Sequence, residues 1–433
     1  MDWGSGGSPD RLRALFPKFL PLLEEEARED ANVPYLDWLR AARPDPAGDL
    51  PWLLQRLERL PVSEDDRAER FDSLQVPIAW RLGSATASRT TTRGRDAGPF
   101  FHPGPLLSRR DVSLERELAA PPLPVRRLTR RQGAAVVELV REATAVRYRE
   151  YYGFTHADPA TVRAVEIGRG IEVSLMGLAP GRRLPLRAAF AALFVKNGVP
   201  IGYFEALCLF ERIEVGYNVY YTFRDGESAW IFAQALRLFH QVLGVTSFSI
   251  DPYQLGHENT EAIESGAFWF YRKLGFRPTG TNRARLLALE EKKIASSPGY
   301  RSPAGVLRRL VTGNVLYETE PSRDWEEFHV RRIGLVVLRR MRTRYGGDPE
   351  VARRRASARV ARLLSIRIPA GRSAEDLALV LDAVPDLSRW SRAERAAAAA
   401  IVRAKASRDE IRYLRLLQRH TRLRRALIRL GSG

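Results

Sequence analysis

The chain of 433 residues contains little cysteine, little lysine and no long apolar run. Its one cysteine, Cys208, excludes an intramolecular disulfide, and the apolar run at residues 204–210 predicts that this thiol is a small buried side chain. No stretch of about 18 apolar residues is present, so no membrane span is expected. The chain begins with acidic, glycine and serine residues, unlike an export signal, so we expect a cytoplasmic protein.

Lysine accounts for only six of the 70 basic residues, and arginine dominates a formal net charge of +19. A basic surplus of this size attracts polyanions such as nucleic acid, which release counterions on binding. Arginine enrichment can also follow from genomic base composition. The charge therefore leaves two interpretations open, a nucleic-acid or other polyanion partner and a solvated basic surface.

A length of 433 residues exceeds that of one typical domain and predicts two or three domains. The 45% of hydrophobic and 28% of charged residues indicate a folded core. Residues 1–82 predict a helical N-terminal region. Residues 83–124 are rich in chain breakers and predict a linker or extended segment; His102 within it has no neighbouring metal ligands, so no metal site is expected. Residues 296–433 predict a basic helical C-terminal domain. The N-terminal region has helix-like apolar spacing at residues 12–29 and 35–60.

Strand-like and helix-like patterns alternate in residues 125–295, which predicts an α/β (α+β) domain. Asn197-Gly198 supplies the positive backbone dihedrals of a tight hairpin. The expected strands are 125–128, 186–195, 200–210, 213–223 and 245–250. The expected helices are 133–151, 159–167, 229–243 and 261–274, and residues 286–294 fit either a strand or a helix.

The end of the last of these helices combines an apolar face with a stop signal. Gly275 is suited to the left-handed position after the helix, Phe276 to the hydrophobic contact that follows it, and Pro278 prevents the helix from resuming. The apolar face, at three- and four-residue spacing, consists of Ala267, Phe270, Tyr271 and Leu274.

With this motif and the order of elements before it, the segment over about residues 125–290 resembles the GNAT superfamily of N-acetyltransferases. The resemblance implies a GNAT-like mixed central sheet with flanking helices, acetyl-CoA as the acyl donor, and an amine as the acceptor. It also implies that Tyr271 lies near the departing coenzyme A sulfur, where its hydroxyl can protonate the thiolate. The alternative is that Tyr271 only packs against the inner face of its helix.

The turn before the helix at 229–243 resembles the family's pyrophosphate-binding loop, in which small residues let backbone N–H groups approach the phosphates. An alignment from Arg224 retains the arginine and Ala229 but places Glu227 where glycine is usual. An alignment on Gly226 places Ser228 at the final small position. The alternative is a polar turn in which Ser228 caps the helix.

The resemblance implies further contacts. Backbone groups around Tyr221 and Thr222 would hold the thioester carbonyl if the strand bulges there. Asn259 would contact the pantetheine arm, although it equally suits a helix N-cap, and Ala267 and Phe270 belong to the coenzyme-contacting helix. Two carboxylates on expected strands, Glu205 and Glu214, are candidates for the general base. Strand alternation does not decide which of them faces the site.

Two functions fit these observations. The first is an acyl-CoA-dependent N-acyltransferase that acetylates an amine on an unidentified acceptor. The second is a GNAT-like module, noncatalytic or aminoacyl-tRNA-using, that binds nucleic acid through its arginine-rich helices. These helices are expected at residues 325–345, 351–364 and 422–429.

Overall fold

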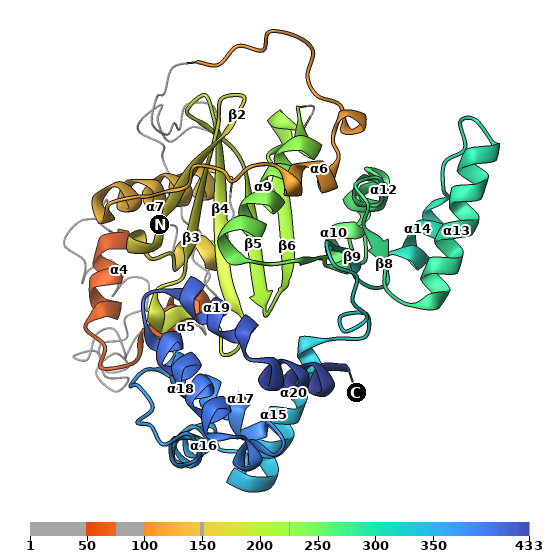
Figure 1. The fold of residues 1–433 in the computed structure, drawn as a ribbon. Coiled ribbons are helices and arrows are strands. Elements are labelled where there is room, and N and C mark those ends of the chain that lie inside the picture. Colours follow the sequence, from red (N-terminus) through yellow and green to blue (C-terminus); the bar gives the residue numbers. More distant parts are fainter. Residues whose placement is uncertain (1–48, 75–98, 148–150, 225, 433) are drawn as a thin grey trace, which may run out of the picture. The chain divides into compact units, whose positions relative to one another are not determined.

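The computed structural model describes residues 49–74, 99–147, 151–224 and 226–432, and the chain forms two compact units, Met1–Gly83 and Ser84–Gly433 (Figure 1). The first unit contains the described helices α4 (Asp49–Glu58) and α5 (Glu64–Leu74). Helix α4 lies within the helix expected at 35–60, whereas the helix expected at 12–29 lies outside the described residues.

One mixed sheet of nine strands forms the centre of the second unit, in the order β1-β2-β3-β4-β5-β6-β7-β9-β8 (Figure 1). Neighbouring strands are antiparallel except β6 and β7, which are parallel and joined through helix α9 (Ser228–Leu243). The predicted α/β class is thereby confirmed. The strands are β1 (Arg126–Arg127), β2 (Arg163–Gly168), β3 (Ile171–Gly177), β4 (Ala188–Lys196), β5 (Val199–Leu209), β6 (Arg212–Val219), β7 (Ser247–Ile250), β8 (Arg277–Pro278) and β9 (Val315–Glu318).

Strands β4 and β5 form the hairpin that the sequence predicts. At its turn Asn197 and Gly198 have φ angles of 48° and 77°, the left-handed region that these residue types tolerate. Nearly every residue of β4 is buried, because the strand has a neighbour on each side and packing on both faces. Cys208 on β5 is fully buried, as expected, and burial raises the pKa of its thiol.

The helix expected at residues 159–167 is wrong. A short 3-10 turn at Pro159–Thr161 is followed by strand β2, which pairs with β3 over Arg163–Gly168. Val165 and Ile167 are buried on either side of exposed Glu166, an alternation with a period of two residues. Its partner β3 did not appear among the expected strands.

Helices cover the two faces of the sheet. Helices α9 and α12 (Ala267–Lys273) pack against the face that carries Phe204. Helices α7 (Arg130–Ala145) and α8 (Tyr152–Thr155) pack against the face that carries Tyr203. The helix expected at 261–274 is divided at Gly266, whose φ is 68°. Residues 286–294 are helical. The helices are α6 (Leu114–Ala119), α7 (Arg130–Ala145), α8 (Tyr152–Thr155), α10 (Pro252–Leu255), α11 (Thr260–Glu264), α12 (Ala267–Lys273), α13 (Thr281–Ser296) and α14 (Ala304–Leu310).

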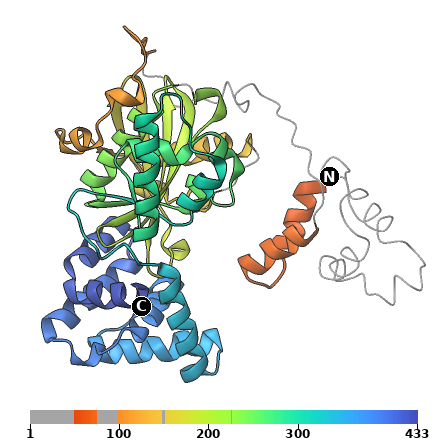
Figure 2. The same cartoon turned by 90° about the vertical axis from the view of Figure 1, so that its right-hand side faces the viewer.

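The C-terminal part is helical, as expected, and lies beyond one end of the sheet (Figure 2). Strand β9 precedes these helices and belongs to the central sheet. No helix in the described part of the chain is long and apolar enough to cross a membrane. The C-terminal helices are α15 (Val330–Tyr345), α16 (Pro349–Leu364), α17 (Arg372–Ala383), α18 (Arg392–Ala406), α19 (Glu410–Arg419) and α20 (Thr421–Ser432).

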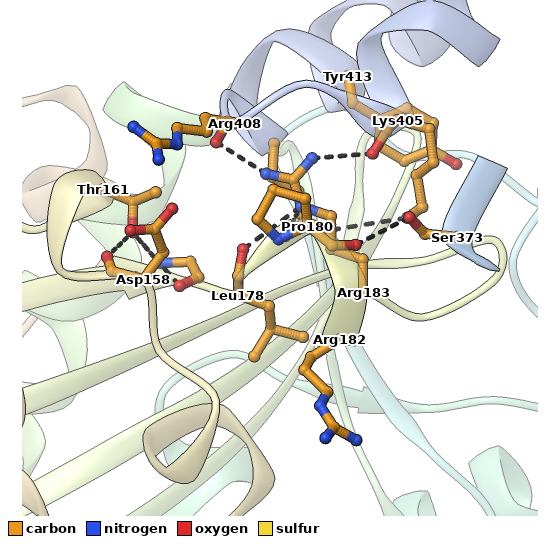
Figure 3. A network of polar contacts seen from close by, with 12 residues as sticks. Asp158, Thr161, Leu178, Pro180, Arg182, Arg183, Ser373, Lys405, Arg408 and Tyr413 are labelled. Atoms are coloured by element: carbon orange, nitrogen blue, oxygen red, sulfur yellow. Dashed lines mark hydrogen bonds and ion pairs between the residues drawn. The ribbon is translucent and has the colours of Figure 1, made fainter. Parts of the chain in front are cut away.

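Arg183 links the loop before β4 to these helices (Figure 3). Its buried guanidinium donates hydrogen bonds to the carbonyl oxygens of Lys405, at 2.9 Å, and Arg408, at 2.7 Å, and to that of Ser407. It also lies 3.4 Å from the carboxylate of Glu410. These contacts satisfy one carbonyl group in the last turn of α18 and two in the residues that follow the helix.

Candidate functional site

The predicted stop signal at the end of α12 is confirmed. Gly275 has a φ of 103°, and its N–H donates to the Arg272 carbonyl at 3.0 Å. The Phe276 N–H donates to the Tyr271 carbonyl at 3.2 Å, and the two rings pack 5.9 Å apart. This pair of bonds and the accompanying ring contact form a Schellman motif.

Tyr271 lies inside an aromatic cluster. Its side chain is 4% exposed, and its ring centroid is 5.5 Å from that of Phe232 on α9. Its hydroxyl forms no hydrogen bond with a described residue, and burial raises its pKa. Tyr217 on β6 also contacts Phe232, and its hydroxyl donates to the Ser228 carbonyl at 3.0 Å. In the same helix as Tyr271, Ala267 and Phe270 are half-buried.

Strands β6 and β7 are paired over only part of β6. Residues 212–215 pair with residues 247–250, whereas none of the described strands pairs with residues 216–219 on this side. Helix α10 follows β7 here, and the side-chain amide of its Gln254 lies 3.8 Å from where a Cβ on Gly216 would be. The chain therefore leaves one edge of β6 unpaired beside α10.

The turn after β6 has no bulge. Strand β6 ends at Val219, and the residues Tyr221–Phe223, which include Thr222, form a 3-10 turn. The side chain of Tyr221 is 84% exposed. The Arg224 guanidinium donates to the Val219 carbonyl at 3.3 Å and pairs with Glu261. The conformation that we expected to hold a thioester carbonyl is therefore a helical turn.

Helix α9 begins at Ser228, with Glu227 at the N-cap position and no side-chain cap, so the alternative in which Ser228 caps the helix is wrong. Ala229 is buried in the first turn, whereas Gly226 is exposed. The buried Glu227 carboxylate instead accepts from Arg169, at 2.7 Å, and from the Leu107 N–H, at 2.9 Å. Burial favours a higher pKa, but these hydrogen bonds outweigh it and lower the pKa of Glu227.

Asn259 caps helix α11. Its side-chain oxygen accepts from the Ala262 N–H at 3.2 Å, and its amide donates to the Tyr253 carbonyl at 3.2 Å. The simpler of the two interpretations of this residue, a helix N-cap, is thus the one that the structure contains.

Glu205 and Glu214 lie on the same face of the sheet. Glu205 is paired with Gly216 and Glu214 with Leu207, while Phe204 and Tyr217 face the opposite side with Tyr271. Burial raises the pKa of Glu205. The two candidate bases are therefore brought to one face, and Tyr271 lies on the other.

A cavity of about 200 Å³ opens beside Glu214, between the sheet and the start of α15. The Arg187 guanidinium lies 3.2 Å from the Glu214 carboxylate, and Arg212 lies 3.7 Å from it. The remaining polar lining consists of Asp251, Asn314, His329 and Arg331.

The ionisable groups of this Glu214 cavity are perturbed by their surroundings. Burial raises the pKa of Asp251, against a hydrogen bond from the Tyr253 N–H, and the Glu214 charge adds to the rise. Burial lowers the pKa of His329, and Arg332 and Arg212 lower it further, which favours the neutral imidazole. Perturbed groups that converge on a cavity are typical of a functional site.

Sequence reasoning identified Glu214 but missed Asp251, Arg212 and His329. Asp251 was detectable as an Asp-Pro helix start directly after a strand. His329 lies 115 positions after Glu214, and no local pattern connects them. Comparison with known proteins found no matching family model, curated protein or solved structure.

Proposed function

We propose that the chain is an acyl-CoA-dependent N-acyltransferase with a GNAT-like central domain. The observation that carries the proposal is the β6–α9–β7 connection. Its two parallel strands are paired over four positions, and β6 then continues with this edge unpaired while its other edge stays paired with β5. The uncapped N-terminus of α9 and the Tyr271 helix follow this unpaired edge in the chain.

Acyl-CoA has two features that suit this arrangement. Its pyrophosphate is an anion of the kind that helix N-termini bind, and the first turn of α9 has no side-chain cap competing for its N–H groups. Its pantetheine arm is extended and carries amides, which can hydrogen-bond along a free strand edge such as residues 216–219. Gln254 offers a further amide beside this edge.

The proposed reaction uses both faces of β6. The acceptor amine enters through the Glu214 cavity, and Glu214 accepts its proton, with Glu205 as the alternative base. The amine then attacks the thioester carbonyl at the unpaired edge of β6. Tyr271, on the opposite face, protonates the departing sulfur as the C–S bond breaks.

A second function is favoured by the distribution of charge. Residues 304–432 contain 29 basic and 14 acidic residues, a net charge of +15 out of +19 for the chain. On α15, exposed Arg331, Arg339 and Arg342 lie along one side of the helix. This concentration supports a GNAT-like module that binds nucleic acid, noncatalytically or with aminoacyl-tRNA as its donor.

The transferase is tested by Tyr271→Phe, with Tyr217→Phe as the matched control. Both variants keep an aromatic ring in the same cluster, but only Tyr217 loses a hydrogen bond, which costs about 0.5–1.5 kcal/mol of stability. Thiol release from acetyl-CoA in the presence of a panel of primary amines is measured. Tyr271→Phe should lower turnover by about 100-fold with little loss of stability. Equal turnover in wild type and Tyr271→Phe removes Tyr271 from the mechanism.

A further inference from the structure

Four ionisable side chains meet at the N-cap of α9, three of which, His102, Lys196 and Arg169, have no part in the proposed transfer reaction. Lys196 Nζ lies 2.7 Å from His102 Nε2, and Arg169 Nη2 lies 3.0 Å from His102 Nδ1. Arg169 also binds the Glu227 carboxylate through Nε at 2.7 Å and through Nη2 at 2.6 Å. This His102 cluster joins the segment before α6, the β2–β3 turn, the end of β4 and the N-cap of α9.

The hydrogen bonds of His102 determine the protonation of its neighbours. A guanidinium only donates, so Arg169 requires Nδ1 of His102 to be an acceptor. A neutral imidazole with an acceptor at Nδ1 carries its proton on Nε2. That N–H points at Lys196, and only an unprotonated amine can accept it. If Lys196 were protonated, His102 would have to face an N–H donor with its own N–H group at one of its two contacts, with Lys196 or with Arg169.

The surroundings of Lys196 favour the same state. Burial lowers the pKa of Lys196, and Arg169 lowers it further, against the attraction of Glu227. Glu227 is 3.9 Å from Lys196 Nζ, and its oxygens already accept from Arg169 and the Leu107 N–H. About a quarter of the Lys196 side chain, 24%, remains exposed to solvent.

We infer that the contacts of the His102 cluster make Lys196 a nucleophilic amine and a site of acylation by acyl thioesters. The Nζ lone pair attacks the thioester carbonyl carbon, the C–S bond breaks, and the sulfur leaves as a thiolate. An amide forms, and the proton lost from Nζ is taken up by the thiolate. This modification needs only a thioester in solution and is independent of the transferase proposed above.

The probe is S-acetyl-N-acetylcysteamine, a small thioester without a nucleotide. The full-length protein is treated at a series of pH values, and acetylation of each lysine is quantified by mass spectrometry, which is simple with only six lysines. Lys292 on α13 is the matched control, since it is exposed and has no ion pair with a described residue. The pH midpoint of Lys196 acetylation should be lower than that of Lys292.

Two variants complete the test. His102→Gln places an amide that can accept from a protonated lysine, so the Lys196 midpoint should shift upward toward that of Lys292 while thermal unfolding shows that the variant is folded. Tyr271→Phe should leave Lys196 acetylation unchanged. Equal midpoints for Lys196 and Lys292 in the wild type, an unchanged midpoint in folded His102→Gln, or dependence on Tyr271 would each overturn the inference.

Discussion

Replacing Arg183 with methionine tests how the C-terminal helices are attached to the sheet. The substitution keeps a long apolar side chain but removes every donor of the guanidinium. The carbonyl groups of Lys405, Ser407 and Arg408 then lose their charged partner, and so does the Glu410 carboxylate. Figure 3 shows Lys405 and Arg408 on either side of the Arg183 guanidinium, while the side chain of neighbouring Arg182 points away.

The expected loss is about 3–5 kcal/mol in the free energy of unfolding. Each hydrogen bond from a charged donor contributes roughly 1.5–3 kcal/mol, but water can reach the more exposed Arg408 carbonyl region and reduce the total. Glu410 keeps Lys405 as a partner at 3.6 Å, which limits the cost of leaving its charge buried. Burial lowers the pKa of Lys405 to about 8, so this remaining partner is charged at neutral pH but weakens above it.

Urea denaturation of the full-length protein measures this loss, and hydrogen–deuterium exchange localises it. Amides of α18 and α19 should exchange faster in Arg183→Met than in wild type, because these helices meet at the Arg183 contacts. Arg408→Met is the control, since it removes an exposed side chain but keeps the carbonyl that Arg183 binds. A loss below about 1 kcal/mol, or equal exchange in the two variants, would refute this account of the attachment.

Two other substitutions test separate parts of the fold. Asp382→Asn should destabilise the protein by about 3 kcal/mol at pH 7, because buried Asp382 pairs with Arg340 and Arg359. The hydrogen bonds from the two arginines outweigh the effect of burial and lower the pKa of Asp382. The wild type should therefore be more stable than the variant above the ordinary pKa of about 4, and this difference in unfolding free energy should disappear as the pH falls through the lowered pKa. A difference that stays constant with pH in urea titrations would contradict this. Gly275→Ala should cost about 1–3 kcal/mol, because φ is 103° and the new Cβ would lie 3.0 Å from the Tyr317 ring. The control Gly334→Ala, in open space on α15, should stabilise by about 0.5–1 kcal/mol, and equal thermal shifts would be evidence against strain at Gly275.

Features with local chemistry could be predicted from the sequence. The Asn197-Gly198 turn and the Gly275 stop depend on the conformational preferences of one or two residues, and both were found as expected. The six residues of β2 fit the periodicity of a helix as well as that of a strand, and the sequence pattern was interpreted as a helix. Pairing with β3 makes the segment a strand. The break at Gly266 was missed because the apolar spacing continues across it.

Features that depend on distant pairing could not be predicted. The sequence placed Glu205 and Glu214 on strands, but their common face follows from the β5–β6 register. The sequence also placed Glu227 in a phosphate-binding loop without indicating that Arg169 neutralises it. His329 reaches the Glu214 cavity only because α15 begins beside the sheet.

The transferase proposal is tested most directly by calorimetric titration of the full-length protein with acetyl-CoA, free coenzyme A and tRNA over a series of salt concentrations. We predict saturable binding of both coenzyme forms that persists at moderate salt. Phosphate contacts alone would weaken steeply with salt, whereas contacts to the pantetheine arm would not. Undetectable coenzyme binding, together with steeply salt-dependent tRNA binding, would contradict the transferase and favour the nucleic-acid-binding module.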